Sequence, residues 1–220
     1  MKKQKSVLSL ILILLLVLFS AGCSSGSAPT TGTENTQQNT QPAASDSGNQ
    51  PAEKTVRIGI IQIVEHPALD AAREGFLETL KANGLEPGKN LIVDYQNAQN
   101  DQSILNNIAQ KFASSNYDLV LAIATPSAQA MAAATSEIPI LITAVTDPVA
   151  AKLVNSMEKP GTNVTGTTDM NPIDEQFDLL LKLVPNAKNV GVIYNAGEIN
   201  SQVQVDIAKE IAAERGLKIV

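Results

Sequence analysis

Polar side chains that could bind a small molecule follow most of the strands that the sequence predicts. They carry hydroxyl, amide and carboxylate groups, and they stand where helices are expected to begin. The candidate binding residues are Glu65, His66, Thr125, Pro126, Ser127, Thr146, Asp147, Thr168, Asp169, Asn195, Glu198, Asn200 and Ser201. In open parallel sheets, ligands bind beyond the carboxyl ends of the strands. The spacing therefore predicts a ligand site assembled from several loops.

The segment Thr125-Pro126-Ser127 has the clearest chemical use. A helix start leaves backbone N–H groups without partners, and the helix dipole favours an anion there. With a hydroxyl added, such a start suits a carboxylate. An ordinary helix cap is the alternative. Asp147 is likewise either a cap or a partner for a ligand ammonium group, and Asp169 and Glu198 share that ambiguity.

Signatures of catalysis are missing from the sequence. It contains no G-x-G-x-x-G, G-x-x-x-x-G-K-[ST] or G-x-S-x-G motif. His66 is the single histidine, and we interpret it as a loop or helix-start residue rather than a base. With one cysteine, Cys23, the chain has no pair for a disulfide or a cysteine metal site. We expect no enzyme activity, no cofactor and no metal.

Cys23 lies at the end of a segment with the features of a signal peptide. Three lysines precede the apolar run 7–19, and small residues at 20–22 lead to the cysteine. This pattern resembles the lipobox of bacterial lipoproteins, in which the thiol is acylated and residues 1–22 are removed. A transmembrane anchor is the alternative, but about 20 apolar residues are needed to span a membrane. We expect a lipid-anchored protein on the extracytoplasmic face of the cell membrane.

The chain after Cys23 is acidic and begins with a polar segment. Without residues 1–22 it has 13 basic and 22 acidic residues, a net charge of −9, which argues against nucleic-acid partners. Residues 24–54 have almost no large apolar side chain. Such a composition predicts a disordered tether. A Gln/Asn-rich adhesive segment is the other interpretation.

Strand and helix patterns alternate from Thr55 onward. Apolar strand runs are expected at 56–63, 91–95, 118–124, 139–145, 162–168, 189–194 and 217–220. Helical patterns lie between them. The first runs from residue 67 to Gly84, and the second is capped by Asp101 and has Ile104, Ile108 and Phe112 on its apolar face. Further helices are expected at 126–134, briefly after Pro148, and at 173–184 and 203–211. This alternation is typical of an α/β protein with parallel sheets flanked by helices.

The pattern predicts two lobes. We place an N-terminal α/β lobe at 55–169 and part of a second α/β lobe at 170–220. The second lobe has about two predicted strands, against the five or six usual in such sheets. We therefore expect it to be incomplete at residue 220. The runs around Gly59 and Gly191 look alike, which indicates either two similar lobes or the general likeness of all βα units.

Several of these segments together resemble one family. They are the lipobox, the polar tether and the runs 58–62, 65–70, 124–128, 145–149, 166–169 and 194–201. This set is similar to ABC-transporter substrate-binding lipoproteins of the tryptophan- and tyrosine-binding group, over residues 56–220. The resemblance implies a type I periplasmic-binding-protein fold of two lobes. It also implies a monomer that delivers an amino acid, often aromatic, to a permease and its ATPase.

The same resemblance implies roles for the candidate residues. Thr125 and Ser127 would hold the ligand carboxylate, and Asp147 or Asp169 would face the ammonium. The opposite wall would be lined by Glu65, Asn195 and Glu198. Composition supports a small zwitterion over a sugar, because sugar receptors stack rings on aromatic side chains and this chain has no Trp. A surface adhesin or signalling lipoprotein and an extracellular α/β enzyme are the other hypotheses.

Overall fold

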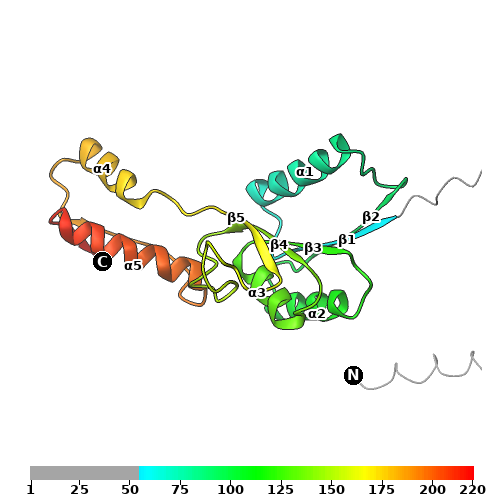
Figure 1. Cartoon of the computed structure of the whole chain (residues 1–220). Helices are drawn as coiled ribbons and strands as arrows, with labels where there is room; N and C mark the ends of the chain where they lie inside the picture. Colours follow the sequence, from blue (N-terminus) through cyan, green and yellow to red (C-terminus); the bar gives the residue numbers. More distant parts are fainter. Residues whose placement is uncertain (1–54) are drawn as a thin grey trace, which may run out of the picture. The chain divides into compact units, whose positions relative to one another are not determined.

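The computed structural model describes residues 55–220, and the signal peptide, Cys23 and the tether lie outside this range. Strands and helices alternate through the described residues as the sequence predicts, except that no helix lies between the strands Ile140–Val145 and Val164–Thr168. The strands of the first sheet are β1 (Val56–Gln62), β2 (Leu91–Asn97), β3 (Leu119–Ile123), β4 (Ile140–Val145) and β5 (Val164–Thr168). All are parallel, in the order β2-β1-β3-β4-β5 (Figure 1). The predicted α/β architecture with parallel strands is confirmed.

None of the helices within residues 55–220 has the length and apolarity needed to cross a membrane.

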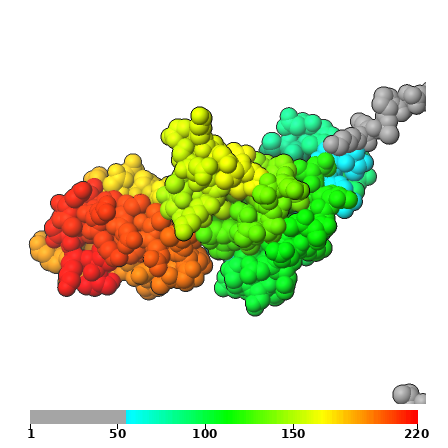
Figure 2. All heavy atoms as spheres, turned by 60° about the horizontal axis from the view of Figure 1, so that its bottom comes forward, coloured from blue at the N-terminus to red at the C-terminus, as the bar shows by residue number. Residues whose placement is uncertain are grey.

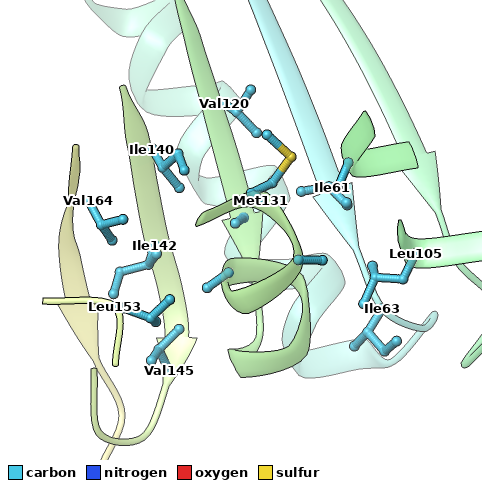
Figure 3. Close-up of a cluster of buried hydrophobic side chains, with 14 of the residues drawn as sticks. Ile61, Ile63, Leu105, Val120, Met131, Ile140, Ile142, Val145, Leu153 and Val164 are labelled. Atoms are coloured by element: carbon cyan, nitrogen blue, oxygen red, sulfur yellow. The ribbon is translucent and has the colours of Figure 1, made fainter. Parts of the chain in front are cut away.

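Three helices cover the two faces of the first sheet (Figure 1). They are α1 (Pro67–Ala82), α2 (Gln102–Ala113) and α3 (Thr125–Ala134). Side chains alternate between the faces of a strand, so Ile58 and Ile60 pack with α1. Ile61 and Ile63 join the cluster formed with α2 and α3, which Figure 3 shows around Met131. Both faces of the central strands β1 and β3 are thus buried, which accounts for their continuous apolar runs.

Gly59 lies where the Phe112 side chain of α2 packs against β1. A Cβ atom added to Gly59 would lie 2.8 Å from both Cδ2 and Cε2 of Phe112. The Phe112 ring is fully buried and is tilted against the Tyr117 ring, with the ring centres 4.9 Å apart. The missing side chain of Gly59 therefore makes room for the largest buried side chain of the α2 face.

The residues after Thr168 form a second, smaller α/β arrangement. It consists of α4 (Ile173–Leu183), β6 (Asn189–Val190), α5 (Ile199–Glu214) and β7 (Lys218–Ile219). The two strands pair in parallel. Ile173 and Phe177 of α4 pack with the buried alanines of α5 and with Leu217.

The predicted strand at 189–194 is wrong in length. Only Asn189 and Val190 are paired, with Lys218 and Ile219. Beyond them the amide of Val192 donates to the carbonyl of Val220 at 3.3 Å, and Ile193 is fully exposed. A strand needs neighbours along its whole length, and β7 offers only two paired residues. The predicted strand at 217–220 is shortened for the same reason.

Two helix predictions also need correction. No helix follows Pro148: the residues form turns, and Lys152 has a φ of +58° that a helix cannot continue through. In Figure 2 this segment between β4 and β5, coloured yellow-green to yellow, stands out from the surface. In α2, Ile104 is 41% exposed, and Leu105 takes the inward position instead.

Candidate ligand-binding site

The strand order creates a natural binding position between β1 and β3. From β1 the chain passes through α1 to β2 on one side, and from β2 it passes through α2 to β3 on the other side. The connections diverge at this point, and in open parallel sheets ligands bind at the carboxyl ends of the strands where this happens. Residues just after Gln62 and Ile123, which pair in register, therefore line the expected site.

The start of α3 has an unusual set of free polar groups. Thr125 is the first residue of the helix, and Ala124 before it has a φ of +77° and supplies no side-chain cap. Thr125 and Ser127 are 2% and 0% exposed, and neither hydroxyl has a hydrogen-bond partner. Neither residue acts as an ordinary cap, which was the alternative to ligand binding. Pro126 stands in the first turn, where its lack of an N–H costs nothing.

The backbone before α3 is held in a conformation that alanine rarely adopts. Both Ala124 and Ala144, near the ends of β3 and β4, have positive φ angles, +77° and +54°. Such residues cost on the order of 1–3 kcal/mol and are concentrated at functional sites. Strain at two neighbouring strand ends supports the assignment of this edge of the sheet to binding.

Electrostatics at the start of α3 favour an anion. The first backbone N–H groups of a helix lack partners within the helix, and its dipole adds partial positive charge there. The hydroxyls of Thr125 and Ser127 can each donate a further hydrogen bond. Together these groups can hold a carboxylate without any basic side chain.

Gln62 is a candidate that the motif reasoning missed. Its side chain is 0% exposed at the end of β1. The Nε2 amide donates to the carbonyl of Val64 at 2.8 Å and to Oδ1 of Asp70 at 3.0 Å, while Oε1 is buried without a partner. The signal was present in the sequence: Gln62 is the only polar residue in the run 58–63.

Asp147 acts as a cap for the turn that follows β4. Its Oδ1 accepts the backbone N–H groups of Val149 and Ala150, each at 2.9 Å. Thr146 beside it is 8% exposed. This is the capping role that the sequence left open for Asp147. The second carboxylate oxygen, Oδ2, takes no part in these two bonds.

The candidates after β5 and β1 lie on the surface. Thr168 ends β5, and the backbone N–H of Asp169 donates to the carbonyl of Val145 at 3.2 Å; both side chains are exposed. Glu65 is also exposed. His66 is the N-cap of α1, because its Nδ1 accepts the N–H of Ala68 at 3.3 Å. This is the helix-start role expected for His66.

The candidates near α5 form one hydrogen-bonded cluster. The Glu198 carboxylate accepts Nδ2 of Asn195 at 2.8 Å and Nδ2 of Asn200 at 3.2 Å. Oδ1 of Asn200 is buried without a partner, and Ser201 follows in the first turn of the helix. The neighbouring Ile199 packs against the core cluster of α2 and α3.

A separate hollow of about 390 Å³ lies among α4, α5 and the residues after β6. Phe177, Leu180, Tyr194 and Ser201 are among the residues that line it. Tyr194 thus faces this largely apolar hollow and is 45% exposed. Of the predicted site residues, only Ser201 borders it. Among residues 55–220, no group of three or more His, Cys, Asp or Glu side chains is placed to hold a metal ion.

Residues 57–220 match the family described as ABC transporter substrate binding protein. A curated relative from Clostridioides difficile strain R20291, named a tyrosine-binding protein, is 45% identical over 221 residues. That match covers 100% of this chain and 61% of the relative. The chain therefore spans about three fifths of the length of that protein.

Solved structures agree with the family match. One is from Streptococcus pneumonia in complex with L-Trp, with 38% identity and a TM-score of 0.74 over 76% of this chain and 56% of that one. Another is the ligand-free, open structure of a substrate binding protein with adhesive properties from Clostridium difficile. It has 56% identity and a TM-score of 0.63 over the same two shares.

A more distant structure bears on the fold alone. A periplasmic binding protein from Burkholderia mallei has 15% identity and a TM-score of 0.55, over 76% of this chain and 45% of that one. The α/β arrangement described above is thus that of type I periplasmic-binding proteins.

Proposed function

This chain belongs to the family of ABC transporter substrate-binding proteins, and from that premise we propose that it is a receptor for an aromatic amino acid. In this proposal it binds and releases its ligand without chemistry and presents it to the permease and ATPase of an importer. It does so as a monomer on the extracytoplasmic face of the membrane.

One observation carries the proposal: three buried polar atoms at the ends of β1 and β3 have no hydrogen-bond partner. They are Oε1 of Gln62, Oγ1 of Thr125 and Oγ of Ser127. An unsatisfied buried polar group costs about 1–3 kcal/mol. A protein that keeps three such groups at one edge of a sheet gains from a ligand that satisfies them. Their position at the switch in strand order supports the same interpretation.

The chemistry of these groups selects the ligand class. The start of α3, with Thr125 and Ser127, suits a carboxylate. Asp147, through Oδ2, and Asp169 supply negative charge for an ammonium at the neighbouring strand ends. The aromatic side chain is supported by relatives, since one is named for tyrosine and another was solved with L-Trp.

Binding requires motion around the site. The polar atoms that would contact the ligand are buried in this structure, as is Oδ1 of Asn200 at the start of α5. A ligand therefore reaches them only when the segments that cover them separate. Closure around the ligand would then bring Glu65, Asn195 and Glu198 to its other side. The ligand would stabilise the closed state by its greater affinity for that state.

Anchoring completes the proposed function. Acylated Cys23 would fix the protein to the membrane, and residues 24–54 would act as the tether that lets it reach the permease. A lipid anchor suits a receptor that hands its ligand to a membrane partner. Both features lie in the part of the chain outside the described residues.

A thermal-shift screen of the full-length protein against all common amino acids tests the ligand class. A ligand at 100 times its Kd should stabilise the protein by about 2.7 kcal/mol. We expect tyrosine, tryptophan or both to raise the melting temperature, with D-glucose as the negative control. A shift with a sugar or a peptide and none with any amino acid would refute the proposal.

A surface adhesin is the second candidate, because one similar protein is described as having adhesive properties. The two roles can be separated with Ser127→Ala, a change at the buried base of the proposed ligand site. Adhesion of cells that display the protein should persist in this variant, whereas amino acid uptake should fall. Adhesion with no amino acid binding in the unmodified protein would favour the second candidate.

A further inference from the structure

Gln62 is held in one orientation by two neighbours that can only accept hydrogen bonds. The carbonyl of Val64 lies 2.8 Å from Nε2, and Oδ1 of Asp70 lies 3.0 Å from it. Neither group can donate, so the nitrogen of the amide must face them. The oxygen Oε1 then faces the other way, where it is buried and has no donor.

The residues behind Gln62 keep this orientation in place. Asp70 is itself paired with Arg73, whose NH2 group lies 3.6 Å from Oδ1. The Arg73 guanidinium lies over the ring of Tyr95, 4.2 Å from the ring centre. These contacts hold the Asp70 carboxylate in place as an acceptor for Nε2, so the amide of Gln62 keeps its orientation. An acceptor prepared in this way is available for a donor from outside the protein.

The position of Gln62 indicates which donor this is. Gln62 pairs in register with Ile123, two residues before Thr125. Neighbouring strands lie about 4.8 Å apart and a strand rises about 3.3 Å per residue, so the backbone of Gln62 is roughly 8 Å from that of Thr125 at the proposed carboxylate position. In an α-amino acid the ammonium and the carboxylate share one carbon atom. With the carboxylate at α3, the ammonium rather than the distant ring is therefore the ligand group within reach of the Gln62 side chain.

We infer that Oε1 of Gln62 accepts a hydrogen bond from the ligand ammonium and makes the site selective for amino acids over their des-amino analogues. This inference rests on the proposed function. An ammonium has three N–H donors, so Gln62 acts beside Asp147 and Asp169 and does not replace them. Asp70 is a positioning residue, because it acts through Gln62.

Four affinities test the inference: those of the unmodified protein and of Gln62→Met, each with the amino acid found in the screen and with its des-amino analogue. Hydrogen bonds to charged groups imply that Gln62→Met weakens amino acid binding roughly 10- to 150-fold. The des-amino analogue should change by less than about twofold, because it lacks the group that Gln62 contacts. Gln96→Met is the matched control, since Nε2 of Gln96 also donates to a carboxylate, Oδ1 of Asp94, at 2.6 Å. That control should leave both affinities unchanged.

Each other result counts against the inference. Equal losses for both ligands would assign Gln62 a structural role, and an unchanged amino acid affinity would mean that a water molecule satisfies Oε1. If Gln62→Met does not fold, Gln62→Asn keeps an amide but withdraws the oxygen by one methylene, and the same selective loss is expected. If the unmodified protein binds no amino acid, the proposed function fails first, which is a distinct outcome.

Discussion

The hydroxyl of Ser127 is buried without a partner, so in the free protein it costs folding free energy. We expect Ser127→Ala to keep or raise the melting temperature of the ligand-free protein, because the change removes an unsatisfied group. The same change should weaken amino acid binding by about 1.5–3 kcal/mol, the value of a hydrogen bond to a charged group. Scanning calorimetry and equilibrium titration measure the two effects separately.

The matched control is Ser136→Ala, which removes an exposed hydroxyl just beyond the other end of α3. It should change neither the melting temperature nor the affinity. If Ser127→Ala lowered stability and left the affinity intact, Ser127 would be a structural residue and the carboxylate site would be wrong.

Tyr117 and Asp94 form a polar pair beneath α2 whose titration can be followed. Tyr117 donates to Oδ2 of Asp94 at 2.7 Å, and Lys111 donates to the same oxygen at 3.0 Å. Burial, together with the bond and charge of Asp94, raises the pKa of Tyr117 from 10.0 to about 12, against an opposing effect of Arg57. Burial disfavours the charge on Asp94, but its hydrogen bonds from Gln96, Tyr117 and Lys111 outweigh this and lower the pKa of Asp94.

A pH prediction follows from the Tyr117 pKa. Because the folded protein holds this proton more tightly than the unfolded chain, its contribution to stability is complete below pH 10 and is lost as pH rises towards about 12. Ultraviolet titration of tyrosinate should show a step near 12 that is absent in Tyr117→Phe. The variant should also lose less stability than the unmodified protein across this interval. Identical titration curves for the two proteins would contradict the assignment.

At the scale of single residues, the sequence indicated which polar groups lie near the site but not which of them already have hydrogen-bond partners. Thr125 and Ser127 were predicted to bind the ligand because they follow an apolar strand; the structure places them in the first turn of α3, and their binding role stays a prediction. Whether Asp147 caps a turn depends on where the N–H groups of Val149 and Ala150 point, which only the folded backbone decides. Gln62 was passed over because a polar residue inside a strand belongs to no motif.

The packing of β1 against α2 gives a prediction at the scale of elements. A Cβ atom at Gly59 would contact the Phe112 ring at 2.8 Å, so Gly59→Ala should destabilise the protein by about 1–3 kcal/mol through overpacking. Denaturant unfolding measures this. Combined with Phe112→Leu, the loss should be smaller than the sum of the two single changes, because a smaller side chain vacates the space.

Gly75→Ala is the matched control for this prediction. Gly75 lies within α1, and no atom is within 4 Å of the added Cβ. There the change should stabilise by roughly 0.5–1 kcal/mol, the difference in helix preference. If both glycine changes had the same effect on stability, the contact with Phe112 would not explain why position 59 has no side chain.

The sequence predicted the bounds of strands in the centre of the first sheet well. It was wrong about the length of the strand at 189–194 and about a helix after Pro148. Strands β1, β3 and β4 each pair with a strand on both sides, and their apolar runs marked them in the sequence. The run 189–194 has the same composition but pairs at only two residues, because β7 is equally short. Asp147 followed by Pro148 has the sequence pattern of a helix start, and Asp147 does cap a turn there. The positive φ of Lys152 prevents that turn from continuing as a helix.

At the scale of the whole molecule, Cys23 is proposed to determine where the protein acts. Cys23→Ser should remove the acylation site and release the protein from the membrane fraction, while ligand affinity stays unchanged. Cell fractionation followed by mass spectrometry of the N-terminal peptide measures both the release and the lipid. Ser25→Ala, two residues away, should remain anchored; if Cys23→Ser also remained anchored, the lipobox interpretation would be wrong.

The most direct test of the central claim is a calorimetric titration of L-tyrosine and L-tryptophan into the full-length protein. The account predicts saturable binding of one ligand per protein for at least one of them, and the loss of that binding when the carboxylate or the ammonium of the ligand is removed. Absence of binding for both, or binding that survives removal of either charged group, would contradict the receptor assignment.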